Sequence, residues 1–356
     1  MSFLVAVPAW AQDQKVYDMR IQTAVPSASL FYKLLEQMSA NVDTMSNGRL
    51  KIDVLPAGAV VQPFEQLDAT AQGLVEGCFA WGNYWSGKHP AYVLFANAPA
   101  STGLDQDAML AWYYRGEGEK LYNELDQEIM GLDLKPFIIQ PIGPDPLGWF
   151  KSPINSLADF KKMKYRSPPG IAGQTYKEMG VSAVSLPAAE IVPAAQRGVI
   201  DGAEWTSPSD DLNLGLDKIW KNYYLQGLHQ QTDMGELQVN KTFWDSLPKD
   251  LRAIFRSAVQ AQVSETLQAN IDANSQALQE MEAEGVKVHD TPDEYYPAFI
   301  KAQNKITAEY AKKNKFFKKV LDSQIAYAKK IYPYRSQILE LYTNLVNTAH
   351  EEQSAR

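Results

Sequence analysis

The amino-acid sequence predicts an α/β protein of two domains, with one long helix that spans both domains and an additional helix at the C-terminus. Three observations support this class. The chain has 356 residues, which is long enough for two domains. Segments with strand-like alternation and segments with helical periodicity follow one another in two successive sets. A stretch between Pro248 and Gly285 keeps helical spacing throughout.

The first domain is expected to comprise residues 12–138 and about 229–250. Its opening stretch, KVYDMRIQTAV, alternates polar and apolar positions as a half-buried strand does. A helix-like segment ending at Gly48 follows, then a second strand in RLKIDVLPAG and a helix that leads into a third strand near Trp81. This alternation predicts a mainly parallel sheet.

The second domain is expected to comprise residues 139–228 and about 286–310. KMKYRS and SAVSLP are predicted to be short strands, and AAEIVPAAQRG a helix in spite of Pro193, because helical spacing persists around it. The long helix, 251–285, could reach across both domains at about 1.5 Å per residue. The segment 311–356 ends in an apolar-striped helix that could pack on its own chain or on a second copy.

Composition narrows the possible partners. The formal net charge of −8 argues against binding to nucleic acid or to an anionic membrane surface, since both need a basic face. The single cysteine, Cys78, excludes an internal disulfide. Near the N-terminus, FLVAVPAWAQ is an apolar run that ends in a small-x-small pattern, so residues 1–11 are interpreted as a signal-peptide remnant of an exported protein.

Several enzyme motifs are absent from the sequence. It has no GxSxG, no P-loop and no GxGxxG after a strand. The loops expected of a hydrolase or of a nucleotide-binding protein are therefore missing from the sequence. The four histidines have no metal-ligand spacing and are interpreted as surface or structural residues: His89, His229, His289 and His350. Paired carboxylates alone could also indicate glycoside hydrolysis, but sequence does not show their separation.

Three short segments could carry chemistry. KYRSPPG places Arg166 at a strand end before a stiff turn, where its planar guanidinium suits carboxylate recognition. GPDPLGWF presents Asp145 between two prolines. DGAEWTSP places Glu204 and Trp205 at another strand end. Taken singly, an arginine such as Arg166 is more often part of a surface ion pair. An aspartate such as Asp145 more often forms a turn, and a glutamate such as Glu204 is more often solvated.

Taken together, the segments carry a family resemblance. LPAAEIVPAAQRGVIDGAEW followed by VNKTFWDSLPKDLR resembles the extracytoplasmic solute receptors of tripartite ATP-independent periplasmic (TRAP) transporters, across nearly the whole mature chain. The resemblance implies a periplasmic-binding-protein fold, and it places Arg166 where that family holds the carboxylate of its ligand. The acidic stretch after Trp205 most resembles the 2-oxo acid-binding branch, which binds a metal ion with its ligand and forms dimers through a C-terminal helix.

The branch also implies a metal site. Its metal ligands fall on Asp145, Glu204 and the backbone carbonyl of Trp205. Asp145 departs from the pattern, because sodium-binding members have a neutral amide there. A calcium ion and Arg166 would together balance the two acidic residues and one ligand carboxylate, so the charge count favours calcium over the alternative, sodium.

Other candidates are less specific. Tyr84 and Trp85 fall where the family's first domain closes over the ligand, Asn240 matches an asparagine near the hinge, and Gln140 is a possible further pocket group. Trp81 is assigned to the core. Among the remaining acids, Asp201 is expected at a turn, with a role in the metal shell as the lesser alternative, and Asp210 and Asp211 are expected to cap a helix beginning at Leu212.

The sequence thus predicts a periplasmic solute-binding receptor of a TRAP transporter, not an enzyme, that binds a small 2-oxo or 2-hydroxy monocarboxylate such as pyruvate or lactate through a metal ion and an arginine. Its expected partners are the TRAP membrane permease subunits and a second copy in a homodimer. Two alternatives stay open: a metal-dependent enzyme acting on an oxo acid, which product formation would reveal, and a ligand-sensing receptor without transport, which genomic neighbours would reveal.

Overall fold

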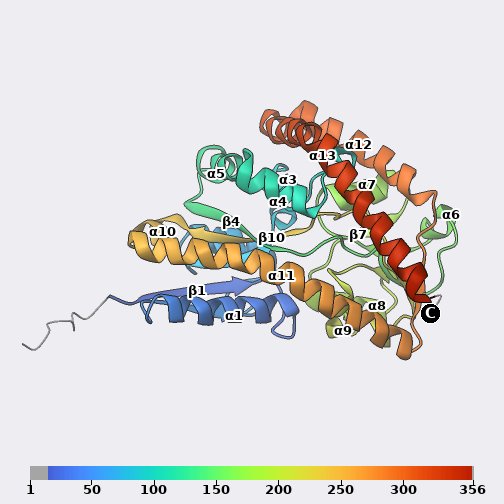
Figure 1. Ribbon diagram of the computed structural model, residues 1–356, viewed down its shortest axis with the longest axis horizontal. Helices are drawn as coiled ribbons and strands as arrows, with labels where there is room; N and C mark the ends of the chain where they lie inside the picture. Colours follow the sequence, from blue (N-terminus) through green and yellow to red (C-terminus); the bar gives the residue numbers. More distant parts are fainter. Residues whose placement is uncertain (1–14, 355–356) are drawn as a thin grey trace, which may run out of the picture.

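The computed structural model describes residues 15–354 and consists of two sheets with helices around them, which confirms the predicted α/β class (Figure 1). The predicted signal-peptide remnant lies outside the described residues. Within 15–354, none of the helices combines the length and the apolar character that a membrane crossing requires.

The first sheet has five strands in the order β2-β1-β3-β10-β4. β1 pairs in parallel with both β2 and β3, whereas β10 is antiparallel to its two neighbours. We call the half of the molecule built on this sheet lobe I. Its elements are β1 (Tyr17–Thr23), α1 (Leu30–Met45), β2 (Leu50–Leu55), η1 (Pro63–Glu65), α2 (Gln66–Ala71), β3 (Gly77–Trp81), η2 (Gly82–Trp85), α3 (Tyr92–Ala96), η3 (Ala100–Thr102), α4 (Gln106–Arg115), α5 (Gly118–Asn123), η4 (Glu124–Ile129), β4 (Leu134–Pro141), β10 (Met234–Asn240) and α10 (Lys241–Ser246).

The second sheet has six short strands in the order β11-β9-β5-β8-β6-β7. β6 is parallel to both β7 and β8, and β5 is antiparallel to β8 and β9. We call this half lobe II. Its elements are β5 (Gly148–Phe150), α6 (Leu157–Phe160), β6 (Lys164–Arg166), α7 (Ile171–Glu178), β7 (Ser182–Val184), α8 (Ala188–Gln196), β8 (Gly202–Ala203), α9 (Pro208–Leu214), η5 (Leu216–Lys218), β9 (Asn222–Tyr224) and β11 (Lys287–His289).

Three connections join the lobes: residues 142–147 between β4 and β5, residues 225–233 between β9 and β10, and helix α11 (Lys249–Ala283). Pro248 is the N-cap residue of α11. The 35 residues of this helix give a length of about 50 Å. α11 contacts α1 and β4 of lobe I and α9 and β11 of lobe II, so it spans both halves (Figure 1).

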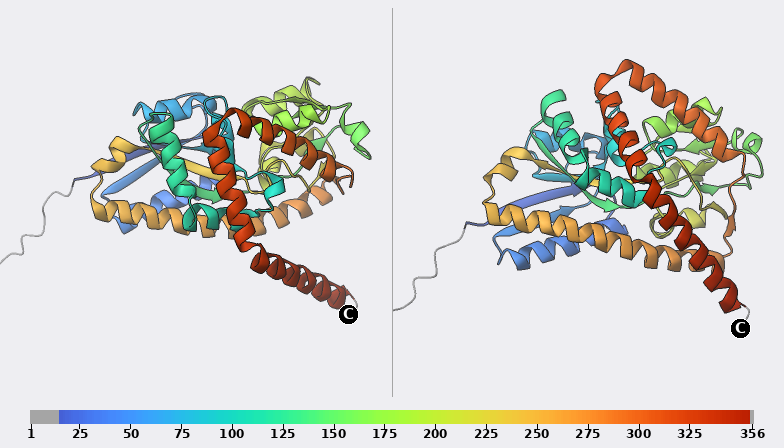
Figure 2. Two further views of the ribbon diagram at one scale, coloured as in Figure 1. Left: turned by 90° about the horizontal axis from the view of Figure 1, so that it is seen from above. Right: turned by 45° about the horizontal axis from the view of Figure 1, so that its top comes forward.

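Two helices follow the last strand. α12 (Tyr295–Lys313) packs against α7 of lobe II, and α13 (Lys315–Ser354) begins with buried residues, among them Phe317 and Val320, beside lobe I. The C-terminal part of α13 then leaves the body of the molecule (Figure 2). It carries a run of exposed large apolar side chains: Tyr332, Tyr334, Leu339, Leu341, Tyr342, Leu345 and Val346.

Candidate metal and ligand site

Arg166 is fixed at the end of β6, between the two lobes. Its side chain is 3% exposed. Nε and Nη2 donate to the carbonyl oxygen of Leu186 at 3.0 and 2.9 Å, and Nη1 donates to the carbonyl oxygen of Glu204 at 3.0 Å. The guanidinium also lies over the Trp205 ring, 5.3 Å from its centroid. These contacts hold the charged group in one orientation.

Glu204 lies next to Arg166 because their strands are neighbours. β8 pairs in parallel with β6, so Glu204, the residue after β8, reaches the guanidinium at the same sheet edge. Its Oε1 forms a buried ion pair with Arg166, and its Oε2 has no hydrogen-bond partner among the described residues. Burial raises the pKa of Glu204 to about 8, although Arg166 acts in the opposite direction.

Asp145 reaches the same place from the first connection between the lobes. Its backbone N–H donates to the carbonyl oxygen of Gln230 in the second connection, at 3.0 Å. The side chain is fully buried, and neither carboxylate oxygen has a partner within residues 15–354. Burial, followed by the nearby charges of Asp233 and Glu204, raises the pKa of Asp145 well above its usual range. Such a group needs a proton or a cation.

The structure therefore assembles a group that could hold a metal ion. Asp145, Glu204 and His229 each offer one ligand atom, and these atoms lie within 4.8 Å of one another. All three residues are buried. Unpartnered carboxylate oxygens facing one point are what a cation would satisfy, so the residues fit the metal that the family resemblance implied.

His229 lies beside the candidate metal group, although the sequence indicated no metal role for it. Its side chain is buried in the second connection, and Nε2 lies 3.9 Å from Glu204 Oε2. Nδ1 lies 2.8 Å from the Tyr176 hydroxyl. Burial, with a smaller contribution from Arg166, lowers the pKa of His229 to about 3. No sequence motif marks this histidine, because its partners come from distant segments.

Asp233 is a further acid that the sequence did not single out. It directly precedes β10, and its Oδ1 accepts hydrogen bonds from Gln230 and from Asn97, the latter at 3.4 Å. Its Oδ2 is unpartnered within the described chain, and burial raises the pKa of Asp233 to about 7. One guanidinium therefore faces three buried carboxyl groups, whereas the charge count from the sequence included only two.

A pocket opens in front of these charged groups. Its walls include aromatic rings from both lobes, and Trp81 and Trp205 meet with their ring centroids 6.1 Å apart. Trp81, assigned to the core from the sequence, is buried but also lines this pocket. The lining comprises Trp81, Asn83, Tyr84, Arg166, Pro168, Pro169, Glu204, Trp205, Thr206, Gln230 and Asp233.

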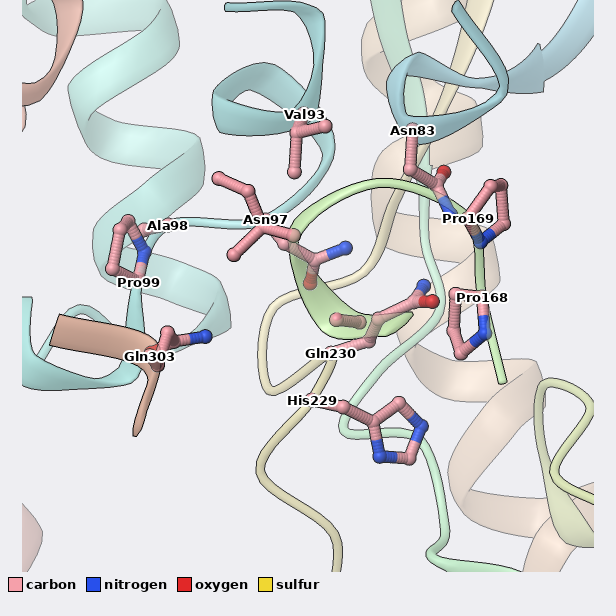
Figure 3. A pocket seen from close by; sticks show the side chains of 12 residues that line it. Asn83, Val93, Asn97, Ala98, Pro99, Pro168, Pro169, His229, Gln230 and Gln303 are labelled. Atoms are coloured by element: carbon pink, nitrogen blue, oxygen red, sulfur yellow. The ribbon is translucent and has the colours of Figure 1, made fainter. Parts of the chain in front are cut away.

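A second hollow adjoins this pocket and shares part of its wall. Figure 3 shows Asn83, Pro168, Pro169 and Gln230, which line both spaces. The His229 ring reaches into the second hollow from the connection between β9 and β10. The lining of the second hollow thus combines amide side chains with apolar ones.

Besides Asp145, three predicted ligand residues do not line either space. The Trp85 side chain turns into lobe I, where Nε1 donates to Glu236 at 2.8 Å. Gln140 Nε2 donates to the carbonyl oxygen of Phe31 at 3.0 Å. Asn240 lies at the end of β10 opposite Asp233, caps α10 through Phe243 N and donates to Thr70 O. Hydrogen bonds within the fold account for all three.

The remaining acids of the stretch around Trp205 also have structural partners. Asp201 pairs with Lys151 and accepts from the backbone of Lys164. The helix that Asp210 and Asp211 were expected to cap begins at Pro208, so both lie in its first turn and Ser207 is the cap. Asp210 binds Ser29 Oγ and Leu30 N at the start of α1, and Asp211 accepts from Trp149 Nε1.

Known proteins resemble this chain in sequence and in fold. The "Monocarboxylate 2-oxoacid-binding periplasmic protein" of Nostoc sp. is 33% identical over 336 residues, 93% of this chain and 89% of that protein. A TRAP transporter solute-binding protein from Bordetella bronchiseptica, with copurified calcium and picolinate in its active site, has a TM-score of 0.89 and 26% identity, covering 95% of this chain and 99% of that one.

A TRAP periplasmic solute-binding protein from Pseudoalteromonas atlantica, with bound sodium and pyruvate, has a TM-score of 0.85 and 28% identity, covering 93% of this chain and 99% of that one. The family model of DctP, bacterial extracellular solute-binding protein family 7, matches residues 21–314. These findings confirm the resemblance inferred from the sequence. The chain belongs to family 7 of the bacterial extracellular solute-binding proteins, the solute receptors of TRAP transporters.

Proposed function

We propose that this protein is a periplasmic receptor that binds a small 2-oxo or 2-hydroxy monocarboxylate, such as pyruvate, together with a metal ion, and delivers it to TRAP membrane permease subunits. The observation that carries the proposal is one buried guanidinium beside carboxylate oxygens that have no partner in the described structure. The family is one of transport receptors rather than of enzymes. The ligands bound by the proteins from Nostoc and Pseudoalteromonas support the choice of ligand class.

Arg166 would hold the ligand carboxylate. A guanidinium has five N–H donors, and here Nε, one donor of Nη2 and the donors of Nη1 serve Leu186 and Glu204. The remaining N–H of Nη2 has no acceptor among the described residues and could serve a ligand oxygen. If Glu204 shares its carboxylate with a cation, the N–H of Nη1 that now serves Oε1 becomes free as well. Arg166 could then offer a bidentate contact.

The metal would be calcium, with sodium as the alternative. Asp145, Glu204 and the backbone carbonyl of Trp205 are the proposed ligands, and all are oxygen donors that suit a hard cation. Asp145, Glu204, Asp233 and the ligand together carry up to four negative charges against the one positive charge of Arg166. A divalent ion reduces this excess further than a monovalent ion, and a proton on one acid would complete the neutralisation.

Calorimetric titration with pyruvate tests the proposal. Protein dialysed against a chelator should bind pyruvate weakly, and calcium should restore binding more effectively than sodium. The same samples, followed by NMR, should show pyruvate unchanged over hours. Tight pyruvate binding in the presence of excess chelator would contradict the metal-dependent site, and consumption of pyruvate would favour the enzyme alternative.

The projecting part of α13 supports the proposal of a homodimer. Its exposed apolar run, from Tyr332 to Val346, needs cover that the described part of this chain does not supply. Sedimentation equilibrium should give the mass of two chains. A variant with Leu341→Asp and Val346→Asp should sediment as a monomer, whereas a substitution at exposed Lys318 on the same helix should leave the dimer intact.

A further inference from the structure

The N-terminus of helix α1 in lobe I is completed by a residue of lobe II. Asp210, in the first turn of α9, accepts a hydrogen bond from Ser29 Oγ at 2.7 Å and one from the backbone N–H of Leu30 at 2.9 Å. Ser29 is the N-cap of α1, and its hydroxyl also accepts from the backbone N–H of Phe31 at 3.1 Å. Asp210 therefore binds both the cap and the first residue of α1.

The contact suits a carboxylate. The first N–H groups of a helix have no partner within the helix, and the helix dipole places positive charge at this end. Asp210 and Ser29 are 2% and 1% exposed, so bulk water does not compete for the bond. Each oxygen of Asp210 accepts from α1, and neither is left unpartnered, unlike oxygens of the acids at the proposed cation site. Asp210 thus serves α1 and not the cation.

Helix α9 also adjoins the wall of the pocket. Ser207, the N-cap of α9, directly follows Thr206, which lines the pocket beside Trp205. The backbone N–H of Thr206 donates to one carboxylate oxygen of Asp211 at 3.3 Å, and Trp149 Nε1 donates to the other at 2.9 Å. These bonds fix the turn between the pocket wall and α9, so a displacement of one moves the other.

The partners in this contact are attached to different parts of the long helix α11 (Figure 1). α1 packs against α11 in lobe I, where Met38 and Ala258 line a groove between the two helices. α9 is joined to α11 through Asn274, whose side-chain oxygen accepts from Ser209 N and Oγ at 3.1 and 2.9 Å. Asn274 lies about 24 Å further along the helix than Ala258. A change in the curvature of α11 therefore changes the distance between α1 and α9.

The lobes are in contact across the pocket in this structure. Trp81 of lobe I and Trp205 of lobe II meet with their ring centroids 6.1 Å apart. At Gly170 of lobe II, an added Cβ would lie 2.9 Å from Val93 Cγ2 of lobe I. The bond from Asp210 to α1 thus belongs to an arrangement in which the cleft is closed.

We propose that Asp210 is a latch, a residue that stabilises the closed receptor by binding the N-terminus of α1, and that opening of the cleft breaks this contact. Asp210 is then a positioning residue, which acts on the ligand only through the population of the closed form. The apparent dissociation constant equals the intrinsic one divided by the closed fraction. The effect on affinity rests on the proposed function, whereas the closed fraction is a property of the protein alone.

The first experiment measures the closed fraction without ligand. Spin labels on Gln37→Cys in lobe I and Lys177→Cys in lobe II, both at exposed positions, report the distance between the lobes by double electron–electron resonance. Cys78 is buried and does not compete for the label. The labelled parent should show a closed and an open population. Asp210→Ala should lower the ratio of closed to open about tenfold, because hydrogen bonds to a charged group are lost.

A conservative variant covers the case in which Asp210→Ala does not fold, as judged by circular dichroism. Asp210→Asn keeps an acceptor for Leu30 N–H but loses the charge at the helix end, so it should give a smaller decrease of the same sign. A parent protein without a closed population would overturn the proposal. An unchanged ratio in a folded Asp210 variant would also overturn it.

Asp159→Ala is the matched control. Ser156 is the N-cap of α6, and its hydroxyl donates to Asp159 Oδ2 at 2.9 Å, so the same pair of residue types caps a helix within lobe II alone. Asp159→Ala should leave the ratio of closed to open receptor unchanged. A decrease as large as that in Asp210→Ala would refute the latch, because loss of a serine–aspartate bond anywhere would then have the same effect.

The partner in lobe I is tested by Ser29→Ala, alone and combined with Asp210→Ala. Ser29→Ala should lower the ratio of closed to open receptor less than Asp210→Ala does, because the bond from Leu30 N–H remains. The double variant should match Asp210→Ala, since both changes remove the same contact. Additive effects of the two substitutions would show that the residues act independently and would contradict the latch.

Calorimetry with pyruvate in the presence of calcium connects the latch to binding. The apparent dissociation constant should rise in Asp210→Ala by the factor by which the closed fraction falls, and it should not change in Asp159→Ala. A larger rise would contradict a role through closure alone. If the parent protein binds no pyruvate in calcium, the proposed function fails, while the distances between the spin labels still decide the latch.

Discussion

Two clusters of buried acids in this molecule look alike until their partners are compared. In lobe I, Glu236 accepts from Trp85 at 2.8 Å, from Gln238 at 3.2 Å and from Tyr122, and nearby Asp126 accepts from Tyr92 at 2.7 Å. We call these two acids the lobe I pair. One oxygen of the pair, Asp126 Oδ2, is unpartnered in the described structure.

The acids between the lobes are buried to the same degree but are poorly supplied with donors. Asp145 has two unpartnered oxygens, and Glu204 and Asp233 have one each, within residues 15–354. Both clusters also have carboxyl pKa values raised by burial. Burial and a raised pKa therefore do not mark a binding site by themselves. Within the described residues, the unpartnered oxygens of Asp145 and Glu204 distinguish the proposed cation site from the lobe I pair.

The largest expected effect follows from removing the Arg166 guanidinium, which lines the pocket. Arg166→Ala leaves Glu204 buried without its ion-pair partner and deprives the ligand of its guanidinium, so pyruvate binding in calcium should weaken by about 2–5 kcal/mol. Calorimetry gives the affinity, and circular dichroism shows whether the variant is folded. Lys164→Ala, at the exposed start of the same strand, is the control. Near-normal affinity in folded Arg166→Ala would remove this residue from the site.

An intermediate effect is expected from Asp145→Asn, which keeps the shape of the side chain and removes its charge. Calcium affinity should fall about ten- to a hundredfold, and sodium should lose less, because calcium affinity follows the number of charged ligands. Titration of each metal in the presence of pyruvate provides the comparison. Equal losses for the two ions, or none, would show that Asp145 is no metal ligand.

The smallest expected effect belongs to the lobe I pair. Glu236→Gln should leave calcium and pyruvate affinities unchanged. Burial raises the pKa of Glu236 from 4.5 to about 7, so the folded state retains a proton that the unfolded state has released. Its contribution to stability is complete below pH 4.5 and is lost as the pH rises to about 7.

Urea denaturation across this pH range measures the effect. The free energy of unfolding of the wild type, relative to Glu236→Gln, should decrease between pH 4.5 and 7 and then level off. A pH-independent difference would contradict the raised pKa. A change in calcium affinity would instead assign the lobe I pair to the cation site.

The site residues that sequence reasoning found are those whose local segments carry a recognisable pattern. Arg166 and Glu204 each follow a strand, and strand neighbours in a parallel pair end at the same edge. Asp233 and His229 were missed because GLHQQTD reads as an ordinary polar loop. They lie in the connection between β9 and β10, where the chain returns from lobe II to lobe I. No local sequence pattern indicates that this connection lies next to Asp145.

The predicted ligand residues that lie away from the pocket show the same limit. Tyr84 and Trp85 are consecutive in the short helix η2, so their side chains diverge, and only Tyr84 lines the pocket. Asn240 is seven residues along a strand from Asp233, at its other end. The α/β class and the long helix were predictable because hydrophobic periodicity sets them. The direction of a single side chain depends on packing that becomes visible only in three dimensions.

The connections between the lobes carry three of the groups around the cation site. Asp145 lies in the connection between β4 and β5, and His229 and Asp233 lie in the connection between β9 and β10. A cation bound there would contact the connections between the lobes. In the empty receptor, mutual repulsion among the acids would push the two connections apart. Neutralisation of their charge by a bound ion would remove this repulsion. Binding of a single ion would therefore change the angle between the two lobes.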